Sequence, residues 1–556
     1  MSEPAPYLTV EESEFYDLVI IGNGPCALAL SARLRERYPH PIYTDVEQIR
    51  FLFIRKHAGK ISTRRHKTLS PKTPPRSPSQ RRRGLKMVSV GSSASGWLDS
   101  WRAMFRSFGI SFLRSPMFFH SHPDPDGLIA YAHATGRENE LKEIQGVVGK
   151  ERSKHQVKRK RGKKLPLTDI NERDRKDYFR PSSHLFFDFC DRIVDDYGLH
   201  DNLLPAHGVD IASARIHVRG TGCLPESGMA IKLQDGRTIG AKAAVLAVGI
   251  NSQPRLPDCI HTSSDHITHT GQIPLKGLVQ TLLQSKIRSP QTFTRVLVIG
   301  GGLTSAQIVH GLVEAGVDQV VLVTRNAFIR VKDFDFNLDW AAKYKNARKA
   351  AFWNETDMEE RWKIIGEARG GGSVNPEYWG ILQRHIKAGR VELLTGACME
   401  GNVWDEATQR WYVDFEVSPA IEDLDRKKFK ELEGRQQDLF DHIYCATGSK
   451  PDIETLECMQ SVVRSHPIDV CHGLPCLTED LQWCEDVPLF VVGGFAALQV
   501  GPTAYNLEGG RACAERVALK LEDMFQLSEE TDQAGYEDPR GGSFFSVLSP
   551  SGPLDL

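Results

Sequence analysis

The first part of the chain passes from a strand-like to a helix-like hydrophobic pattern. Residues 16–21 are almost all apolar, which is typical of a strand buried on both faces of a parallel sheet, and residues 22–27 read GNGPCA. Apolar positions at helical spacing continue from there to residue 37. The pattern predicts a strand, a glycine turn and a helix, with a second strand at residues 51–54.

The same pattern returns later in the chain, and this repetition carries the fold prediction. Residues 294–324 predict a strand, a glycine turn, a helix and a strand, and residues 488–519 predict a strand, a turn and a helix. Residues 440–448 add another buried strand. Strands that alternate with helices form parallel sheets covered by helices. The sequence therefore predicts an α/β fold with two Rossmann-like dinucleotide-binding domains.

Two basic stretches interrupt this pattern. There is no Asp or Glu between Glu47 and Asp99, and the arginine- and proline-rich stretch 57–96 is expected to be a flexible insertion. The second stretch lies in a loop at 150–170, where residues 152–164 include eight Lys or Arg. Such a run is usually a solvated loop, and a nuclear-import signal is the alternative.

Composition excludes several classes of protein. The 70 Lys and Arg balance 71 Asp and Glu, and a net charge of -1 excludes a globally basic nucleic-acid coat. No apolar stretch reaches the roughly 18 residues that a membrane span needs, and the acidic N-terminus lacks an apolar signal segment. The 11 cysteines include no C-x-x-C pair, so we expect reduced thiols and a cytoplasmic location.

The first glycine turn has the spacing of a dinucleotide site, because Gly22, Gly24 and Ala27 fit the pattern G-x-G-x-x-[G/A]. Gly22 permits the tight turn, Gly24 lets a pyrophosphate approach the backbone, and Ala27 lets the helix pack closely on the strand. Pro25 suits the first helical turn, where no N–H is needed. The phosphate would lie at the positive end of the helix. The alternative is a purely structural glycine turn.

The second glycine turn contains Gly300 and Gly302, with Ser305 at the third small position. The next strand ends at Arg325, where a site specific for NAD has a carboxylate for the ribose 2′-hydroxyl. A guanidinium at this position, with Arg330 beyond it, favours the 2′-phosphate of NADP. Two dinucleotide sites in one chain indicate hydride transfer from a nicotinamide to a flavin.

Small residues at other strand ends are further candidate cofactor contacts. Gly249, Thr447 and Gly448 follow two buried strands, where the chain would pass between the nucleotide domains; plain turns are the alternative. Near the C-terminus, small residues and a proline precede a helix whose positive end would stabilise negative charge on a reduced flavin. These are Gly493, Gly494, Pro502 and Thr503.

Taken in order, these motifs resemble those of the two-dinucleotide-binding-domain flavoproteins, and within them the flavin-dependent monooxygenases. The resemblance covers roughly residues 15–520 and rests on VIIGNGPCALALS, the WLDSW and LRSP segments, VLVIGGGLTSAQ, CATG and the final VVGG. In these segments the chain is similar to the N-hydroxylating ornithine and lysine monooxygenases and to the oxidative-stress-induced growth inhibitor proteins.

The resemblance implies which residues hold which cofactor. Gly22, Gly24 and Ala27 would hold FAD, and NADPH would be held by Gly300, Gly302, Thr304 and Ser305, with Arg325 on its phosphate. In such enzymes NADPH reduces FAD, and the reduced flavin reacts with O2 to form a C4a-hydroperoxide. One oxygen atom then passes to a nitrogen, a sulfur or a carbonyl of a small substrate. No catalytic side chain and no metal site is assigned.

The resemblance also implies the domain organisation. An FAD-binding domain would be formed by residues 15–288 and 440–522, with an NADP-binding domain at 289–439 inserted between the two parts. Residues 1–14 and 523–556 would be tails, the second of them disordered. The oligomeric state is left open.

Departures from the family pattern keep two alternatives open. The expected strand 51–54 is followed by Arg55 and Lys56 instead of an acidic residue for the FAD ribose, which favours a non-catalytic or regulatory flavoprotein fold. A flavin disulfide reductase would need a redox cysteine pair; Cys26 stands alone and Cys471 and Cys476 lie far from either glycine turn. The segment 120–126, HSHPDPD, could mimic a metal cluster, but a solvated or cofactor-adjacent loop is expected.

Overall fold

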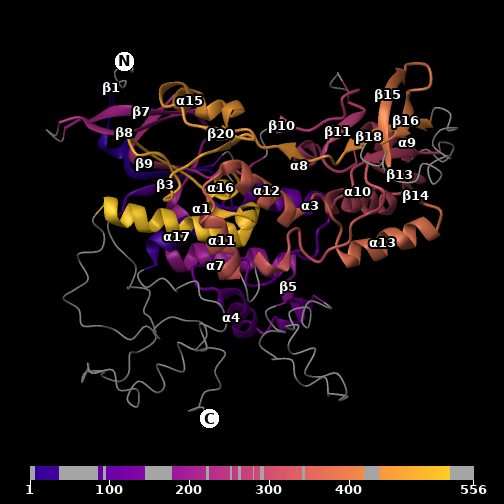
Figure 1. Ribbon diagram of the computed structural model, residues 1–556, viewed down its shortest axis with the longest axis horizontal. Helices are drawn as coiled ribbons and strands as arrows, with labels where there is room; N and C mark the ends of the chain where they lie inside the picture. Colours follow the sequence, from indigo (N-terminus) through magenta and orange to yellow (C-terminus); the bar gives the residue numbers. More distant parts are fainter. Residues whose placement is uncertain are drawn as a thin grey trace, which may run out of the picture.

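The computed structural model describes residues 7–36, 85–91, 96–144, 178–220, 224–250, 253–260, 265–279, 281–287, 293–340, 345–418 and 438–525. Within them, a mixed sheet with a parallel centre and an all-parallel sheet form two lobes, seen at left and right in Figure 1. The expected strand 51–54 with Arg55 and Lys56, the basic loop 150–170, and residues 1–6 and 526–556 of the expected tails lie outside the described residues. The expectation of a tail at 1–14 was wrong for Tyr7–Val10, which form the strand β1 at the end of the first sheet.

The first sheet is built around a run of parallel strands. In spatial order these are β6 (Leu203–Pro205), β3 (Met87–Gly91), β2 (Phe15–Ile21), β9 (Thr238–Leu246) and β23 (Val487–Val491). Leu18 of β2 pairs with Met87 of β3 on one side and with Ala243 of β9 on the other. The sheet continues beyond β9 through β8 (Glu226–Leu233), β7 (Gly208–Val218) and β1 (Tyr7–Val10), and β22 (Gln482–Cys484) pairs with β23.

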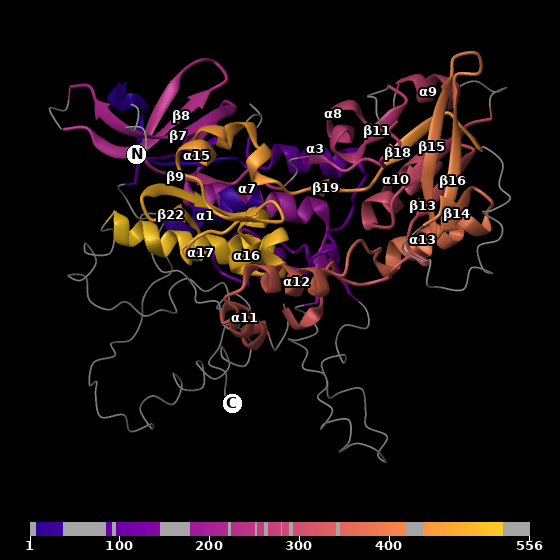
Figure 2. The same cartoon turned by 45° about the horizontal axis from the view of Figure 1, so that its top comes forward.

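Two long helices pack side by side against this sheet (Figure 2). They are α1 (Pro25–Arg35), which directly follows β2, and α17 (Leu507–Met524), near the end of the described chain. Their apolar faces share one hydrophobic core with β2, β3, β9 and β23. The buried guanidinium of Arg33 joins them through ion pairs to Glu515 at 2.7 Å and Glu522 at 2.9 Å.

Shorter elements complete the first lobe. The helix α7 (Ser183–Tyr197) begins at Ser182, whose Oγ accepts a hydrogen bond from the N–H of Leu185, and ends at Gly198 with φ +59°. Its buried residues follow the helical spacing expected from the sequence. The other helices and strands of this lobe are α3 (Asp99–Ser107), α4 (Gly127–Ala134), β4 (Leu141–Glu143), β5 (Phe179–Pro181), α15 (Gln460–Ser465), β20 (Val470–Cys471), β21 (Leu474–Pro475) and α16 (Ala497–Val500).

The second sheet consists entirely of parallel strands among the residues described. Their spatial order is β11 (Ile267–His269), β18 (His442–Cys445), β12 (Arg295–Ile299), β13 (Gln319–Thr324) and β14 (Val391–Thr395). The surrounding helices are α8 (Ile273–Lys276), α9 (Thr281–Ile287), α10 (Leu303–Glu314) and α13 (Pro376–Lys387). An antiparallel sheet packs beside them and contains β15 (Ala397–Asp405), β16 (Arg410–Val417) and β17 (Asp438–Phe440).

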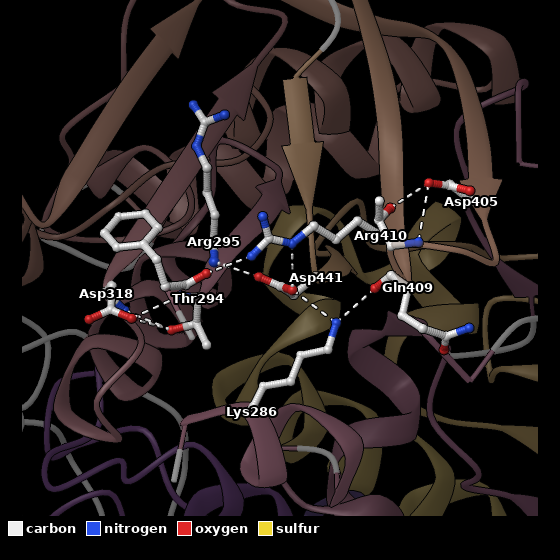
Figure 3. A network of polar contacts seen from close by, with 10 residues as sticks. Lys286, Thr294, Arg295, Asp318, Asp405, Gln409, Arg410 and Asp441 are labelled. Carbon is white, nitrogen blue, oxygen red and sulfur yellow. Dashed lines mark hydrogen bonds and ion pairs between the residues drawn. The ribbon is translucent and has the colours of Figure 1, made fainter. Parts of the chain in front are cut away.

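The amino edge of the second sheet is closed by a buried carboxylate (Figure 3). Oδ1 of Asp441 accepts hydrogen bonds from Lys286 Nζ at 2.9 Å and Arg410 Nε at 3.1 Å, and Oδ2 accepts one from the N–H of Arg295 at 2.8 Å. These partners belong to α9, β16 and β12. The network therefore joins three elements at the amino ends of the strands, which lie opposite the glycine turn.

The strand pairing changes two expected boundaries. The strands β11 and β18, placed by the sequence analysis in segments 15–288 and 440–522, both pair within the second sheet. The chain instead crosses between the lobes at β10 (Gln253–Pro254) and β19 (Ser449–Lys450), which pair with each other. The prediction was wrong here because these short apolar strands look alike locally, whereas their sheet is chosen by long-range pairing.

The basic insertion also needs correction. Although residues 57–96 were expected to be a flexible loop, Met87–Gly91 form the fully buried strand β3 beside β2. Residues 85, 86 and 96 are described as well, and the rest of that stretch lies outside the described residues. The charge pattern of the stretch concealed a short apolar run, MVSVG, that the sheet requires.

A segment of the second lobe crosses to the first lobe and returns. We call residues 330–373 the bridging segment; it contains α11 (Lys345–Trp353) and α12 (Met358–Arg369), and residues 341–344 of it are outside the description. In Figure 2 its helices lie beneath α16 and α17, away from the second sheet. Its buried apolar side chains join the hydrophobic core of the first lobe: Phe336, Trp340, Phe352, Ile365 and Ala368.

Candidate cofactor sites

The first glycine turn is locked between the ends of two neighbouring strands. The N–H of Gly22 donates to the carbonyl of Val90 on β3 at 2.7 Å. A Cβ on Gly22 would lie 2.4 Å from the carbonyl oxygen of Ala247, and its φ is +122°. No other residue type fits this position without displacing the backbone of the strand beside it. Gly22 is therefore required by the fold itself.

The next positions of this turn leave space above the helix. Gly24 is the N-cap of α1 with Pro25 as its first residue, and a Cβ on Gly24 would meet no atom within 4 Å. Ala27 is completely buried, as close helix–strand packing requires. The free N–H groups at the start of a helix attract phosphate. The open space at Gly24 thus fits the diphosphate of a dinucleotide.

A buried loop lies against the first turn. The Oγ of Ser121 donates to the carbonyl of Pro25 at 2.9 Å, and His120, His122 and Asp124 are all buried. Burial, together with the positive charge of nearby Arg511, holds the pKa of His120 well below its usual range, and burial also lowers the pKa of His122. The expected alternative of a solvated loop was therefore wrong; the loop is packed beside the candidate cofactor site.

The potential metal ligands of this loop are occupied by its own backbone. The Nδ1 of His122 accepts from the N–H of Asp124 at 2.9 Å, and Oδ1 of Asp124 accepts from the N–H of Asp126 at 2.9 Å. Among the described residues, the groups with metal-ligand spacing lie elsewhere. One is His310 with Glu314 and His385, and the other is Glu359 with Cys471 and His472.

The second glycine turn repeats the geometry of the first. The N–H of Gly300 donates to the carbonyl of Val323 on β13 at 2.9 Å, and a Cβ on Gly300 would lie 2.4 Å from the carbonyl oxygen of Ala446. Its φ is +149°. The Oγ of Ser305, which replaces the expected small residue, donates to the carbonyl of Gly302 at 2.6 Å. Thr304, assigned to the cofactor by resemblance, is exposed on the first turn of α10.

Gly302 faces the end of the bridging segment. A Cβ on Gly302 would have the Cα of Gly372 as its nearest neighbour, at 3.8 Å. A Cβ on Gly371 would lie 3.2 Å from Nη1 of Arg330, and one on Gly370 would lie 2.9 Å from Nζ of Lys332. The glycine loop 370–372 therefore lies between the second turn and two cations.

The end of β13 is rich in uncompensated positive charge. Arg325 is exposed directly after this strand, and Arg330 and Lys332 follow it. Within the described chain none of these three side chains forms an ion pair, in contrast to Arg369, which lies 3.3 Å from a carboxylate oxygen of Asp335. Free guanidinium and ammonium groups beside a helix N-terminus suit the additional phosphate of NADPH.

The small residues between the lobes lie close to the paired crossover strands β10 and β19 in the chain. Gly249 and Gly448 both have φ +77°, and a Cβ on either would meet no atom within 4 Å. The hydroxyl of Thr447 donates to the carbonyl of Arg255, and the N–H of Arg255 donates to the carbonyl of Gly448 at 2.9 Å. These residues hold the two chain segments together where they pass between the lobes, and the space beside both glycines is open.

The C-terminal glycines pack on the first turn. A Cβ on Gly493 would lie 3.3 Å from Sγ of Cys26, and one on Gly494 would lie 2.0 Å from Cγ2 of Ile250. Pro502 and Thr503 are buried in a short 3-10 helix, Pro502–Tyr505. The expected helix start at Pro502 is thus four residues of 3-10 helix, and α17 begins only at Leu507.

Asn506, which the sequence motifs did not single out, is the N-cap residue of α17, although its side chain makes no capping hydrogen bond. Both its Nδ2 and its Oδ1 are buried, and neither has a hydrogen-bond partner among the described residues. Nearby, a Cβ on Gly510 in the first turn of α17 would lie 2.8 Å from Sγ of Cys26 in the first turn of α1. The amino ends of the two helices therefore meet, and an unpaired buried amide there fits a polar cofactor. A capping Asn before a helix was the available signal.

The cysteines near these sites are poor nucleophiles. Burial, with a contribution from Cys513, raises the pKa of Cys26 to about 12. Burial also raises the pKa of Cys471 to about 11 and raises the pKa of Cys476. A flavin disulfide reductase needs a thiolate at neutral pH. The thiols described here do not provide one.

Comparisons with known proteins agree with this architecture. Residues 218–374 match the family model of L-lysine 6-monooxygenase/L-ornithine 5-monooxygenase. An ornithine N-hydroxylase from Kutzneria sp. 744 is 15% identical, with a TM-score of 0.58 over 92% of this chain and 100% of that one. An ornithine hydroxylase from Pseudomonas aeruginosa is 14% identical, with a TM-score of 0.56 over the same shares of the two chains. An L-lysine 6-monooxygenase from Pseudomonas syringae is 14% identical, with a TM-score of 0.53, again over 92% and 100%.

A comparison with curated protein sequences found no match. Among the helices described, none has the length and apolar character needed to cross a membrane. At these low identities the structural matches establish the fold, and the family match covers one segment that includes the second glycine turn. The expected resemblance is confirmed at that level: the chain shares the two-domain α/β fold of these flavin-dependent monooxygenases.

Proposed function

We propose that this protein is an FAD- and NADPH-dependent monooxygenase that transfers one oxygen atom from O2 to a small substrate, with an amine nitrogen as the favoured acceptor. The observation that carries the proposal is the pair of glycine turns with matching geometry, at Gly22 and Gly300, each at the carboxyl end of a strand that lies between two parallel neighbours. Ligands of such sheets bind at this point, where the strand order reverses.

The charge of each site indicates which cofactor it would bind. The first turn, with Gly24, Asn506 and the C-terminal glycines, would hold FAD, and the second turn, with Arg325, would hold NADPH. When bound, these groups supply hydride transfer and the activation of O2. The chain contributes the helix N-termini at the phosphates, the buried walls that exclude water and the cations at the 2′-phosphate.

The substrate class is proposed from the printed names of the similar proteins. Proteins of the matched family act on lysine or ornithine, and a fold relative from Erwinia amylovora, 12% identical with a TM-score of 0.53 over 92% of this chain and 94% of that one, is a cadaverine monooxygenase. Amines of this size are therefore the first candidates. A cytoplasmic location remains part of the proposal, since the reduced cysteines fit a reducing compartment.

The test uses the purified full-length protein. We expect a yellow protein with the visible absorption of bound flavin, which oxidises NADPH faster than NADH. Ornithine, lysine and cadaverine would each be tested for faster NADPH oxidation and for a hydroxylamine product. A colourless protein that takes up no FAD and does not oxidise NADPH would contradict the proposal.

One observation favours a non-catalytic flavoprotein fold as the second candidate. In FAD domains an acidic residue at the end of the second strand binds the ribose. Here β3 ends at Gly91, and the sequence after it, SSAS, contains no carboxylate. A titration with FAD distinguishes the candidates, because a regulatory fold without cofactor would show no saturable uptake.

A further inference from the structure

Arg114, in the LRSP segment of the first lobe, forms an unusual set of hydrogen bonds across the two lobes. Its Nε donates to the carbonyl of Asp333 at 3.0 Å, and its Nη1 donates to the carbonyl of Ser373 at 3.2 Å. Its Nη2 donates to the carbonyls of Lys332 and Phe334, each at 2.8 Å, and to Oγ of Ser373 at 2.9 Å. All three guanidinium nitrogens are used, and every acceptor is a neutral oxygen of the bridging segment.

The acceptors belong to the two ends of the bridging segment. Residues 332–334 lie at its beginning and Ser373 at its end, and the two ends are also joined by backbone bonds. The N–H of Lys332 donates to the carbonyl of Val374 at 3.0 Å, and the N–H of Val374 donates to the carbonyl of Arg330 at 2.8 Å. One guanidinium therefore fastens both ends to the first lobe.

These two ends carry the groups that face the second glycine turn. Arg330 and Lys332 belong to the first end, and the glycine loop 370–372, whose Gly372 lies against Gly302, immediately precedes Ser373. A change in the position of either end would move the cations and the loop together. Arg114 is therefore placed to control the shape of the second site without touching it.

Arg114 itself is held firmly by the first lobe. The N–H of Leu113 donates to the carbonyl of Pro181 at 3.1 Å, and the N–H of Met117 donates to the carbonyl of Phe179 at 2.7 Å. Further along the same segment, Ser121 contacts Pro25 of the first turn, and Phe119 stacks on Phe336 of the bridging segment with ring centroids 6.0 Å apart. The chain from 113 to 121 thus connects the first turn with the bridging segment.

We propose that Arg114 is a positioning residue for NADPH, which holds Arg330, Lys332 and the loop 370–372 in the arrangement that binds the phosphates of the dinucleotide. This inference rests on the proposed function. A planar guanidinium with a fixed fork of donors is needed for five acceptors in two chain segments, and a lysine ammonium cannot reproduce it. The effect is therefore expected in NADPH binding and not in FAD binding.

The test compares Arg114→Lys with the wild-type protein. We expect the KM for NADPH and the dissociation constant for 2′,5′-ADP, measured by calorimetry, to rise roughly 10- to 100-fold, which corresponds to the loss of one or two charged hydrogen bonds. The kcat at saturating NADPH and the FAD content should change less than about 3-fold. Ser373→Ala removes one of the five bonds and should give a smaller rise of about 3-fold.

The matched control is Arg348→Lys, also in the bridging segment. Arg348 is exposed and bonds only to Asp339 among the described residues, so its replacement should leave all four quantities unchanged. Unchanged 2′,5′-ADP affinity in both Arg114→Lys and Ser373→Ala would overturn the inference, as would a parallel loss of FAD and thermal stability. A wild-type protein that binds neither cofactor would instead contradict the proposed function, so the two failures are distinguishable.

Discussion

The two glycine turns share a skeleton but differ in their surroundings. In each, the first glycine has a positive φ, and a Cβ on it would lie 2.4 Å from the carbonyl oxygen of an alanine, Ala247 or Ala446. Around the third position they diverge, since the space at Gly24 is open whereas Gly302 is faced by Gly372. Gly22 and Gly300 are therefore required by the fold, whereas Gly24 and Gly302 are available to a ligand.

Charge separates the two sites as well. Beside the first turn lie the unpaired amide of Asn506 and histidines whose pKa is lowered by burial, and the buried charges there, Asp124 and Arg511, have opposite signs. The second is bordered by three cations that have no ion-pair partner among the described residues, including Arg325. The first site therefore relies on backbone and helix ends, and the second adds side-chain recognition of phosphate.

The strongest test of the comparison replaces the two glycines of the first turn. Gly22→Ala should lower the free energy of unfolding by about 3 kcal/mol or more, because its Cβ clashes with backbone at a strained φ. Gly24→Ala should change it by less than about 0.5 kcal/mol while weakening FAD binding at least roughly 10-fold. Chemical denaturation without FAD and FAD titration measure the two effects, and equal stability losses would break the distinction.

The next largest effect on the free energy of unfolding is expected from the ion pair that joins the bridging segment to the first lobe. Nζ of Lys349 on α11 lies 2.6 Å from Oε1 of Glu508 on α17, and both side chains are buried. Although burial alone would raise the pKa of Glu508, the charges of Lys349 and Lys345 outweigh it and lower the pKa to about 2. The unfolded pKa is higher, so this stability is fully present above about pH 4.5 and is lost as the pH falls toward 2.

We therefore expect the free energy of unfolding of the wild-type protein to drop by roughly 3 kcal/mol more than that of Glu508→Gln between pH 5 and the acid limit. Lys349→Met, which removes the hydrogen-bonded cation from the buried carboxylate and leaves the charge of Lys345, should cost about 3 kcal/mol at pH 7. Denaturation curves at a series of pH values measure both effects. Parallel curves for wild type and Glu508→Gln would show that the pair contributes nothing.

A smaller, purely functional effect is expected at the cation of the second site. Arg325→Ala should weaken NADPH binding roughly 10- to 100-fold and NADH binding less than about 2-fold, because only NADPH carries the 2′-phosphate. The measurement is kcat/KM for each cofactor, with Arg384→Ala, at an exposed arginine in the last turn of α13, as a control. Equal losses for both cofactors would assign Arg325 a different role.

The smallest effect concerns the third small position of the second turn. Ser305 stands where the first turn has Ala27, and its Oγ donates to the carbonyl of Gly302 at 2.6 Å. Ser305→Ala should lower the free energy of unfolding by about 1 kcal/mol and leave NADPH affinity nearly unchanged. A large loss of NADPH affinity would instead make this hydroxyl part of the binding site.

Local sequence was sufficient for both turns, and it failed where distant segments decide the structure. The runs FLFI and MVSVG are equally plausible as the strand beside β2, and the structure gives that place to the second. The expected boundaries at 288 and 439 failed because the sheet of β11 and β18 depends on pairing with β12. Likewise, the LRSP segment was recognised by resemblance, but the acceptors of Arg114 lie 218 or more residues away.

The sequence by itself determined the two strand–glycine–helix units, because each is specified within about fifteen residues by apolar runs, a positive-φ glycine and a helix start. Only the tertiary structure decided what surrounds them: the buried histidine loop, the unpaired amide of Asn506 and the bridging segment held by Arg114. Contacts between residues hundreds of positions apart depend on packing and desolvation, which have no periodic signature in the chain.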